Sequence, residues 1–118
     1  MSAETDLRAL LVADVPTAAL VGTAISADRI EQGTARPFIV FTRTATVREK
    51  TLSGAVLGVL VTLTVQCWAD TRVNAEAVAD AAQAAIEAVF HTVSNREGAS
   101  DPGLDLEAAI LTVEWWES

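Results

Sequence analysis

Apolar side chains occupy every second position along a dozen residues in the middle of the chain, from Leu57 to Trp68. The apolar set consists of Leu57, Val59, Val61, Leu63, Val65 and Cys67. The alternate set, which is mostly polar, consists of Gly58, Leu60, Thr62, Thr64, Gln66 and Trp68. Because successive side chains of a strand point to opposite faces, this pattern predicts one long strand with a dry face and a mostly polar face.

A helical period replaces this alternation from Val73, shortly after Asp70, whose carboxylate is a candidate helix cap. The apolar positions of the helix share one face and are Val78, Ala82, Ala85, Ile86, Val89 and Phe90. The opposite face carries Glu76, Asp80, Gln83, Glu87 and His91. Alanine favours helix and lets a backbone approach a sheet closely, so we expect this helix to lie against the long strand.

The N-terminal part of the chain predicts shorter elements. A first helix has a narrow apolar stripe made by Leu7, Leu10 and Leu11, and Pro16 ends it. Thr17 can cap one further helical turn, which Gly22 closes. The segment Ile25–Ile30 has apolar ends and is typical of a short edge strand.

Two further strands are expected on either side of the central strand and helix. Residues 38–47 are rich in β-branched and aromatic side chains, and the polar residues 48–54 would join this strand to the central one as a long hairpin. The threonines that share one face of the strand are Thr42, Thr44 and Thr46. Residues 92–105 have loop composition, and residues 109–117 alternate again, which predicts a final strand.

These elements predict a single α+β domain over residues 1–118. We expect a two-layer sandwich, in which a mixed or antiparallel sheet of about four strands carries two main helices on one face. The other face would present Thr62, Thr64, Gln66, Thr112 and Glu114, together with Trp68 and Trp116. Exposed tryptophans cluster at interfaces, which makes this face a candidate interaction surface. Cover by the N-terminal segment or the hairpin is an equally good interpretation of the two tryptophans.

The charge of the chain is acidic and uneven. The net charge is −8, which argues against a general nucleic-acid binder because phosphate contacts need a basic surface. Residues 28–50 hold five basic and three acidic side chains, a net of +2, so the remainder carries −10. A single cysteine and the lack of a secretory signal or a long apolar run are typical of a product of a reducing compartment without a membrane span.

No residue constellation predicts catalysis or metal binding. Cys67 falls on the dry face of the central strand, which favours a small buried hydrophobe over a nucleophile. His91 lies on the polar side of the helix end, which favours a surface residue over a general base. One histidine and one cysteine cannot form the usual zinc site, and the acids near Asp101 lack calcium-loop spacing. We therefore expect no enzyme, no cofactor and no metal.

The order of several segments resembles the tail-completion or tail-terminator proteins of long-tailed bacteriophages, prophages and related elements. The resembling segments are Leu7–Leu11, Thr17–Ile25, Arg36–Phe41, Val65–Thr71 with the alanine-rich helix after it, and Leu111–Trp115. The resemblance covers nearly the whole chain and carries no catalytic motif.

This resemblance implies a structural virion protein that caps the head-proximal end of the tail tube as a ring, commonly a hexamer. Its implied partners are other copies of itself, the tail tube protein and a head–tail connector or stopper protein, with DNA passing through the lumen without specific binding. Its implied place is the tail or neck of the virion, and the host cytoplasm during assembly. We take as candidate interface residues Arg43, Arg48, Glu49, Lys50, Trp68 and Trp116.

Three alternatives remain open at this stage. The chain is also compatible with another neck component, namely a head–tail connector or stopper, which binds the portal side rather than the tube. A small enzyme that uses Cys67 or His91 and a small ligand-binding module are further alternatives.

Overall fold

The computed structural model describes residues 3–22, 24–27, 37–50, 56–89, 91–103 and 106–117, and for residues 47–50, 56–58 and 117 it describes the backbone alone. Three helices and five strands follow one another along the chain. Their bounds are α1 Ala3–Ala13, α2 Val15–Val21, β1 Ile25–Ala27, β2 Phe38–Lys50, β3 Val56–Ala69, α3 Arg72–Ala88, β4 Thr92–Asp101 and β5 Leu106–Glu117.

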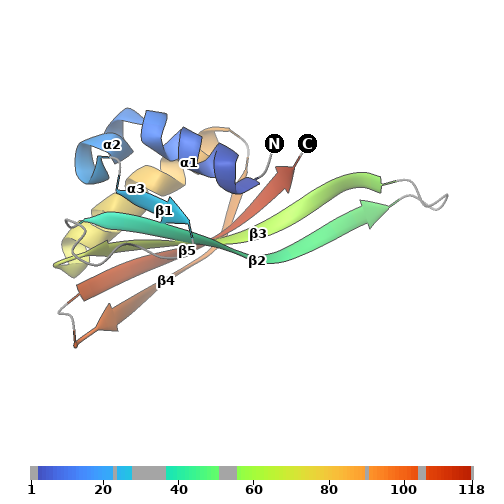
Figure 1. Cartoon of the computed structure of the whole chain (residues 1–118). Coiled ribbons are helices and arrows are strands. Elements are labelled where there is room, and N and C mark those ends of the chain that lie inside the picture. Colours follow the sequence, from blue (N-terminus) through green and yellow to red (C-terminus); the bar gives the residue numbers. More distant parts are fainter. Residues whose placement is uncertain are drawn as a thin grey trace.

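The strands form one open sheet with the order β1-β2-β3-β5-β4, and the helices lie on one of its faces (Figure 1). Only β1 runs parallel to its neighbour β2, whereas the β2–β3, β3–β5 and β4–β5 pairs are antiparallel. The α+β fold is therefore confirmed, with five strands and three helices in place of about four and two.

Strand β4 is the largest departure from the sequence-based prediction. Residues 92–105 were expected to form a loop, but Thr92–Asp101 pair with β5 as the outer strand of the sheet. An edge strand receives its hydrogen bonds from one side and leaves most of its side chains in solvent. Its composition is therefore free to be polar, and polar composition hides it from a search for apolar alternation.

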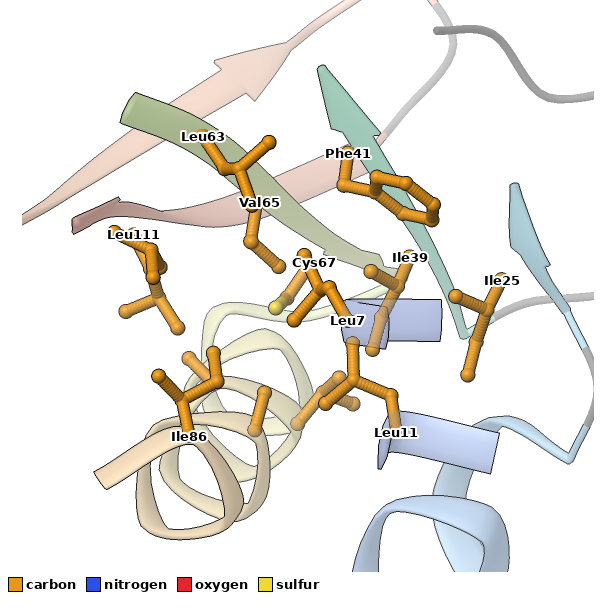
Figure 2. Packing of buried hydrophobic residues seen from close by; sticks show 14 of the residues in the cluster. Leu7, Leu11, Ile25, Ile39, Phe41, Leu63, Val65, Cys67, Ile86 and Leu111 are labelled. Carbon is orange, nitrogen blue, oxygen red and sulfur yellow. The ribbon is translucent and has the colours of Figure 1, made fainter. Parts of the chain in front are cut away.

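The core lies between the sheet and the three helices. The side chains of Val61, Leu63, Val65 and Cys67 are all fully buried, which confirms the dry face of the central strand. Figure 2 shows Leu63, Val65 and Cys67 on the side of β3 that faces the leucines of α1 and Ile86 of α3. Alanines line the face of α3 that meets the sheet, so this helix can lie close to the strands.

Not every predicted core position is buried. Val89 follows the last turn of α3 and is 42% exposed. Val59 is only partly buried against the core. The remaining predicted core positions, the Leu57 side chain and Phe90, lie outside the part of the chain that is described.

The residues that cap α2 and α3 lie three residues and one residue, respectively, from the predicted caps. Thr71, not Asp70, caps α3, because its hydroxyl accepts a hydrogen bond from the Asn74 N–H. Asp14, not Thr17, caps α2, and Pro16 lies in the first turn of this helix, where its missing N–H costs nothing. Gly22 ends α2 with φ +60°, as expected of a glycine at a helix end.

A β-bulge at Thr44 rearranges the faces of β2. The register steps from Arg43, opposite Leu63, to Ala45, opposite Thr62, so one extra residue is accommodated. Thr42 and Ala45 therefore share the face away from the helices, whereas Thr46 lies opposite the buried Val61. The prediction that all three threonines share one face is wrong for this reason.

Candidate functional site

The most distinctive surface feature is an arm formed by the far end of the β2–β3 hairpin, residues 44–50 and 56–60. Figure 1 shows these strands extending well beyond the helix layer. The molecule measures 52 × 28 × 22 Å along its principal axes, and the arm accounts for much of its elongation. Strand β5 stops at Glu117, opposite Val59, so the outermost part of the arm is a two-stranded ribbon among the described residues. Two strands alone are marginally stable in water, which makes the arm a surface that gains from a partner.

Arg43 lies at the base of the arm and points to the helix side. Its Nε and Nη2 donate to Glu4 Oε1 on α1 at 3.0 and 2.6 Å, and its Nη1 donates to Thr46 Oγ1 at 3.1 Å. This ion pair marks the point where the helix layer ends and the arm begins. Of the candidate interface residues, Arg43 therefore anchors the arm within its own chain.

Arg48, Glu49 and Lys50 lie in the outer part of the arm. Their backbones pair with Val59, Gly58 and Val56 of β3, and their side chains lie outside the described part of the chain. The structure thus groups these three residues at one end of the molecule and away from Trp68.

Trp68 lies at the opposite end of the sheet, on the face away from the helices. It packs against a small apolar cluster of Phe38, Val40 and Leu106, and Ala24 also contacts this cluster. Its indole Nε1 donates to Gln66 Oε1 at 3.1 Å. Trp68 is therefore half-buried in a second, minor core.

Trp116 is 50% exposed on the same face, at the base of the arm. It pairs with Leu60, whereas Trp68 pairs with Ala108, so eight positions of β3 separate the two tryptophans. At roughly 3.3 Å per residue this is about 26 Å along the strand. The two tryptophans do not form one patch, and only Trp116 lies beside the arm.

His91 is held by aromatic contact with the neighbouring tryptophan, Trp115. Its ring stacks on Trp115 with a centroid distance of 3.7 Å and an interplanar angle of 15°. Its Nδ1 accepts a hydrogen bond from the Trp116 backbone N–H at 3.4 Å. Burial lowers the pKa of His91 from its usual value, and the Asp6 carboxylate on α1 opposes this shift.

We expect His91 to titrate below pH 6.5 in the folded chain, as followed by NMR of its imidazole protons. Because the folded-state pKa is depressed, the associated stability is fully present above the unfolded-state pKa and is lost as the pH falls through the folded-state pKa. Asp6→Asn should lower the pKa of His91 further, whereas Asp80→Asn is a matched control on another helix. A pKa at or above 6.5 in the parent chain would show that the stacked site does not desolvate the imidazole.

Cys67 has the environment of a core residue. Its side chain is fully buried, and this burial raises the pKa of its thiol to about 12, so the thiolate is scarce near neutral pH. The described residues contain no group of three or more histidine, cysteine, aspartate or glutamate side chains that could hold a metal ion.

Arg96 is an important residue that the sequence analysis did not single out. From β4 it contacts Asp80 Oδ1 at 2.8 Å, Gln83 Oε1 at 3.0 Å and the carboxylate of Glu76, all on α3. Burial alone would lower the pKa of the Arg96 guanidinium, but the hydrogen bonds and charges of Glu76 and Asp80 outweigh it and raise this pKa. The sequence shows the polar stripe of α3, but the loop-like composition of residues 92–105 hides the strand that faces it, so only the structure reveals this link between helix and edge strand.

The charge of the described part of the chain is strongly negative. Its side chains include four arginines and eleven carboxylates, a net of −7 out of −8 for the whole chain. All four arginines make hydrogen bonds or ion pairs within the chain. The described surface is therefore dominated by acids, and the remaining basic side chains belong to residues 28–36 and to the arm.

No helix among the described residues has both the length and the apolar character needed to cross a bilayer.

A search among curated proteins finds no match. A solved structure, described as the virion of a native gene transfer agent particle, contains a chain that superimposes on this one with a TM-score of 0.76. The superposition covers 98% of this chain and 93% of that chain, at 18% identity, so it shows a shared fold.

The family profile described as tail completion protein gp17 matches residues 5–118, which is nearly the entire chain. This match spans both helix layer and arm. The chain therefore belongs to the family of tail completion protein gp17 and is a structural protein of a phage-type tail.

Proposed function

We propose that this protein caps the head-proximal end of the tail tube as a ring, ends polymerisation of the tube and provides the surface that joins the head. The observation that carries this proposal is the arm, which extends the sheet beyond the helix layer in a chain of the tail completion family. A similar fold in a gene transfer agent virion supports the same context.

The charge of the chain supports head-to-tail association. A ring requires two different patches on each subunit, each complementary to the other. The arm contributes Arg48 and Lys50 at one end, and the rest of the described surface is acidic. Opposite charges of this kind speed correct encounters and disfavour wrong ones.

The proposed partners are other copies of the chain in a hexameric ring, the tail tube protein and a head–tail connector or stopper protein. An acidic lumen would let DNA pass without specific binding, because like charges repel. The proposal includes no enzymatic activity and no cofactor. The protein would assemble in the host cytoplasm and remain in the tail or neck of the virion.

The proposal is tested by adding the purified chain to polymerising tail tube protein. We expect rings in negative-stain images and sedimentation, and a fall in mean tube length as the chain is added. The variant Arg48→Glu with Lys50→Glu should weaken ring assembly about tenfold at an unchanged melting temperature, because complementary charges between subunits steer association more than they stabilise the fold. Glu87→Lys on the exposed face of α3 is the matched control.

A strictly monomeric chain that neither binds nor shortens the tube would refute the proposal. Binding to a portal-side ring without binding to the tube would instead identify a connector or stopper. If the double variant assembles as well as the parent chain, the charge-patch part of the proposal is wrong.

A further inference from the structure

Two strand edges of the described sheet lack a neighbouring strand. Strand β1 pairs with residues 39–41 of β2, so within the described residues Thr42–Lys50 pair with a strand on one side only. Strand β4 is the last strand at the other side of the sheet and pairs only with β5 over Thr92–Asp101. The open edges are similar in length and lie on opposite sides of one sheet. A row of unpaired backbone N–H and C=O groups is a template for another strand.

The short edge at β1 is protected. The Ile39 N–H donates to the Ala24 carbonyl, so the alternate carbonyl, that of Ile25, faces away from β2. The Arg8 Nε on α1 donates to this carbonyl at 3.2 Å. Arg8 therefore occupies the acceptor that an incoming strand would need, and the edge available on this side of the sheet starts after β1.

The strand directions also suit pairing between copies. Because β2–β3, β3–β5 and β5–β4 are each antiparallel, β2 and β4 run in opposite directions within one sheet. A copy related by rotation about an axis roughly parallel to the strands keeps these directions, so β4 of one subunit then meets β2 of the next antiparallel. Antiparallel pairing is slightly more stable per residue than parallel pairing.

We propose that the β2 edge from Thr42 to Lys50 pairs with the β4 edge of a second copy of this chain, so that the sheets of neighbouring subunits join. This inference rests on the proposed ring. It names the strands that make the subunit contact and gives a role to β4, a strand of ten residues with a polar sequence.

The charges at the two edges are complementary. The outer end of the β2 edge carries Arg48 and Lys50 against Glu49, a net of +1. The charged side chains of β4 and of the residues beside it sum to −4, from six acids and two arginines. They are Arg72, Glu76, Asp80, Arg96, Glu97, Asp101, Glu107 and Glu114. Opposite net charge favours this contact over β2–β2 or β4–β4 pairing between copies.

The regular parts of the two edges set the register, because register shifts interrupt β2 at Glu49/Lys50 and β4 at Val93/Asn95. An antiparallel alignment that overlaps most of both edges places Ala45 opposite Glu97. Both residues lie on the sheet face away from the helices and are exposed, so the alignment also matches the faces. Because the β2 edge lies in the arm and β4 does not, neighbouring subunits are staggered along the strands. A stagger of this kind accompanies strand tilt when a sheet closes on itself.

Disulfide trapping tests the contact in the full-length chain. Ala45→Cys and Glu97→Cys are made as separate single variants, and they are oxidised alone and as a mixture. The native Cys67 does not interfere, because its buried thiol has a raised pKa. We expect covalent dimers in the mixture at least tenfold above either variant alone, since directly paired positions have the short Cα separation that a disulfide needs.

The matched control replaces Glu97→Cys by Ser100→Cys, which is also exposed on β4 but pairs with Glu107 on the helix side. It should give few links to Ala45→Cys. Rings without mixed links, or links between two Ala45→Cys chains, would overturn the edge pairing and leave the ring proposal standing. A chain that never self-associates would overturn both, and melting curves of each variant verify that it folds.

Discussion

Replacing Leu63 by alanine should lower the free energy of unfolding by about 3–5 kcal/mol, one of the largest losses that a single truncation can cause here. Leu63 is fully buried on β3, the strand that lies between β2 and β5. The variant loses buried methyl and methylene groups and leaves a cavity that a sheet paired on both sides cannot close. For a chain of this size we expect the melting temperature to fall by roughly 10–20 °C.

The control is Leu20→Ala on α2, where the leucine is 39% exposed. This variant should lose less than about 1 kcal/mol, because much of its side chain is already in water. Urea unfolding followed by circular dichroism measures both losses. Equal losses for the two leucines would mean that the dry face of β3 is not the centre of the core.

Replacing Ala82 by leucine should also destabilise the fold strongly, by about 1–3 kcal/mol or more. Ala82 is fully buried on the face of α3 that meets the sheet, as are Ala75 and Ala79. These small side chains let α3 lie close to the strands, so the three extra heavy atoms must displace the helix or its neighbours. Overpacking therefore opposes the gain in apolar surface.

Ala84→Leu is the matched control, since Ala84 lies on the same helix and is exposed. Both variants replace an alanine by a leucine inside the same helix, so the change in helix propensity is the same. The difference in stability between the two variants therefore isolates the packing effect. We expect the thermal unfolding curve of Ala84→Leu to stay within about 2 °C of the parent curve. If Ala82→Leu is as stable as this control, α3 leaves room for a larger side chain between itself and the sheet, and the close-packing argument is wrong.

The long strand and the helix after it could be predicted because each has one buried face. The positions from Val61 to Cys67 alternate between buried and half-exposed, and those from Ala75 to Ile86 follow the helical period. Burial imposes such periods on the choice of side chains, which makes them readable without coordinates. The bulge at Thr44 has no such signal, because a strand with one extra residue has the same kinds of side chains as a strand without it.

The candidate interface residues do not lie on one surface. The basic cluster at Arg48 and Lys50 does fall on a projecting arm, and Trp116 is exposed at the base of that arm. Arg43 instead pairs with Glu4, and Trp68 packs in a minor core about 26 Å away along the strand. Charge and aromatic content identify residues suited to interfaces, but the distance between them depends on strand register.

Side-chain periodicity and composition were sufficient to identify an α+β domain with a central amphipathic strand, an alanine-rich helix against it and no recognisable catalytic motif. These properties follow from which side chains avoid water, and each is local to a short segment. The polar edge strand β4, the link from Arg96 to α3 and the open edges at both sides of the sheet emerged only from the fold. They depend on backbone hydrogen bonds between distant segments, which every residue except proline can make, so the side chains carry little record of them.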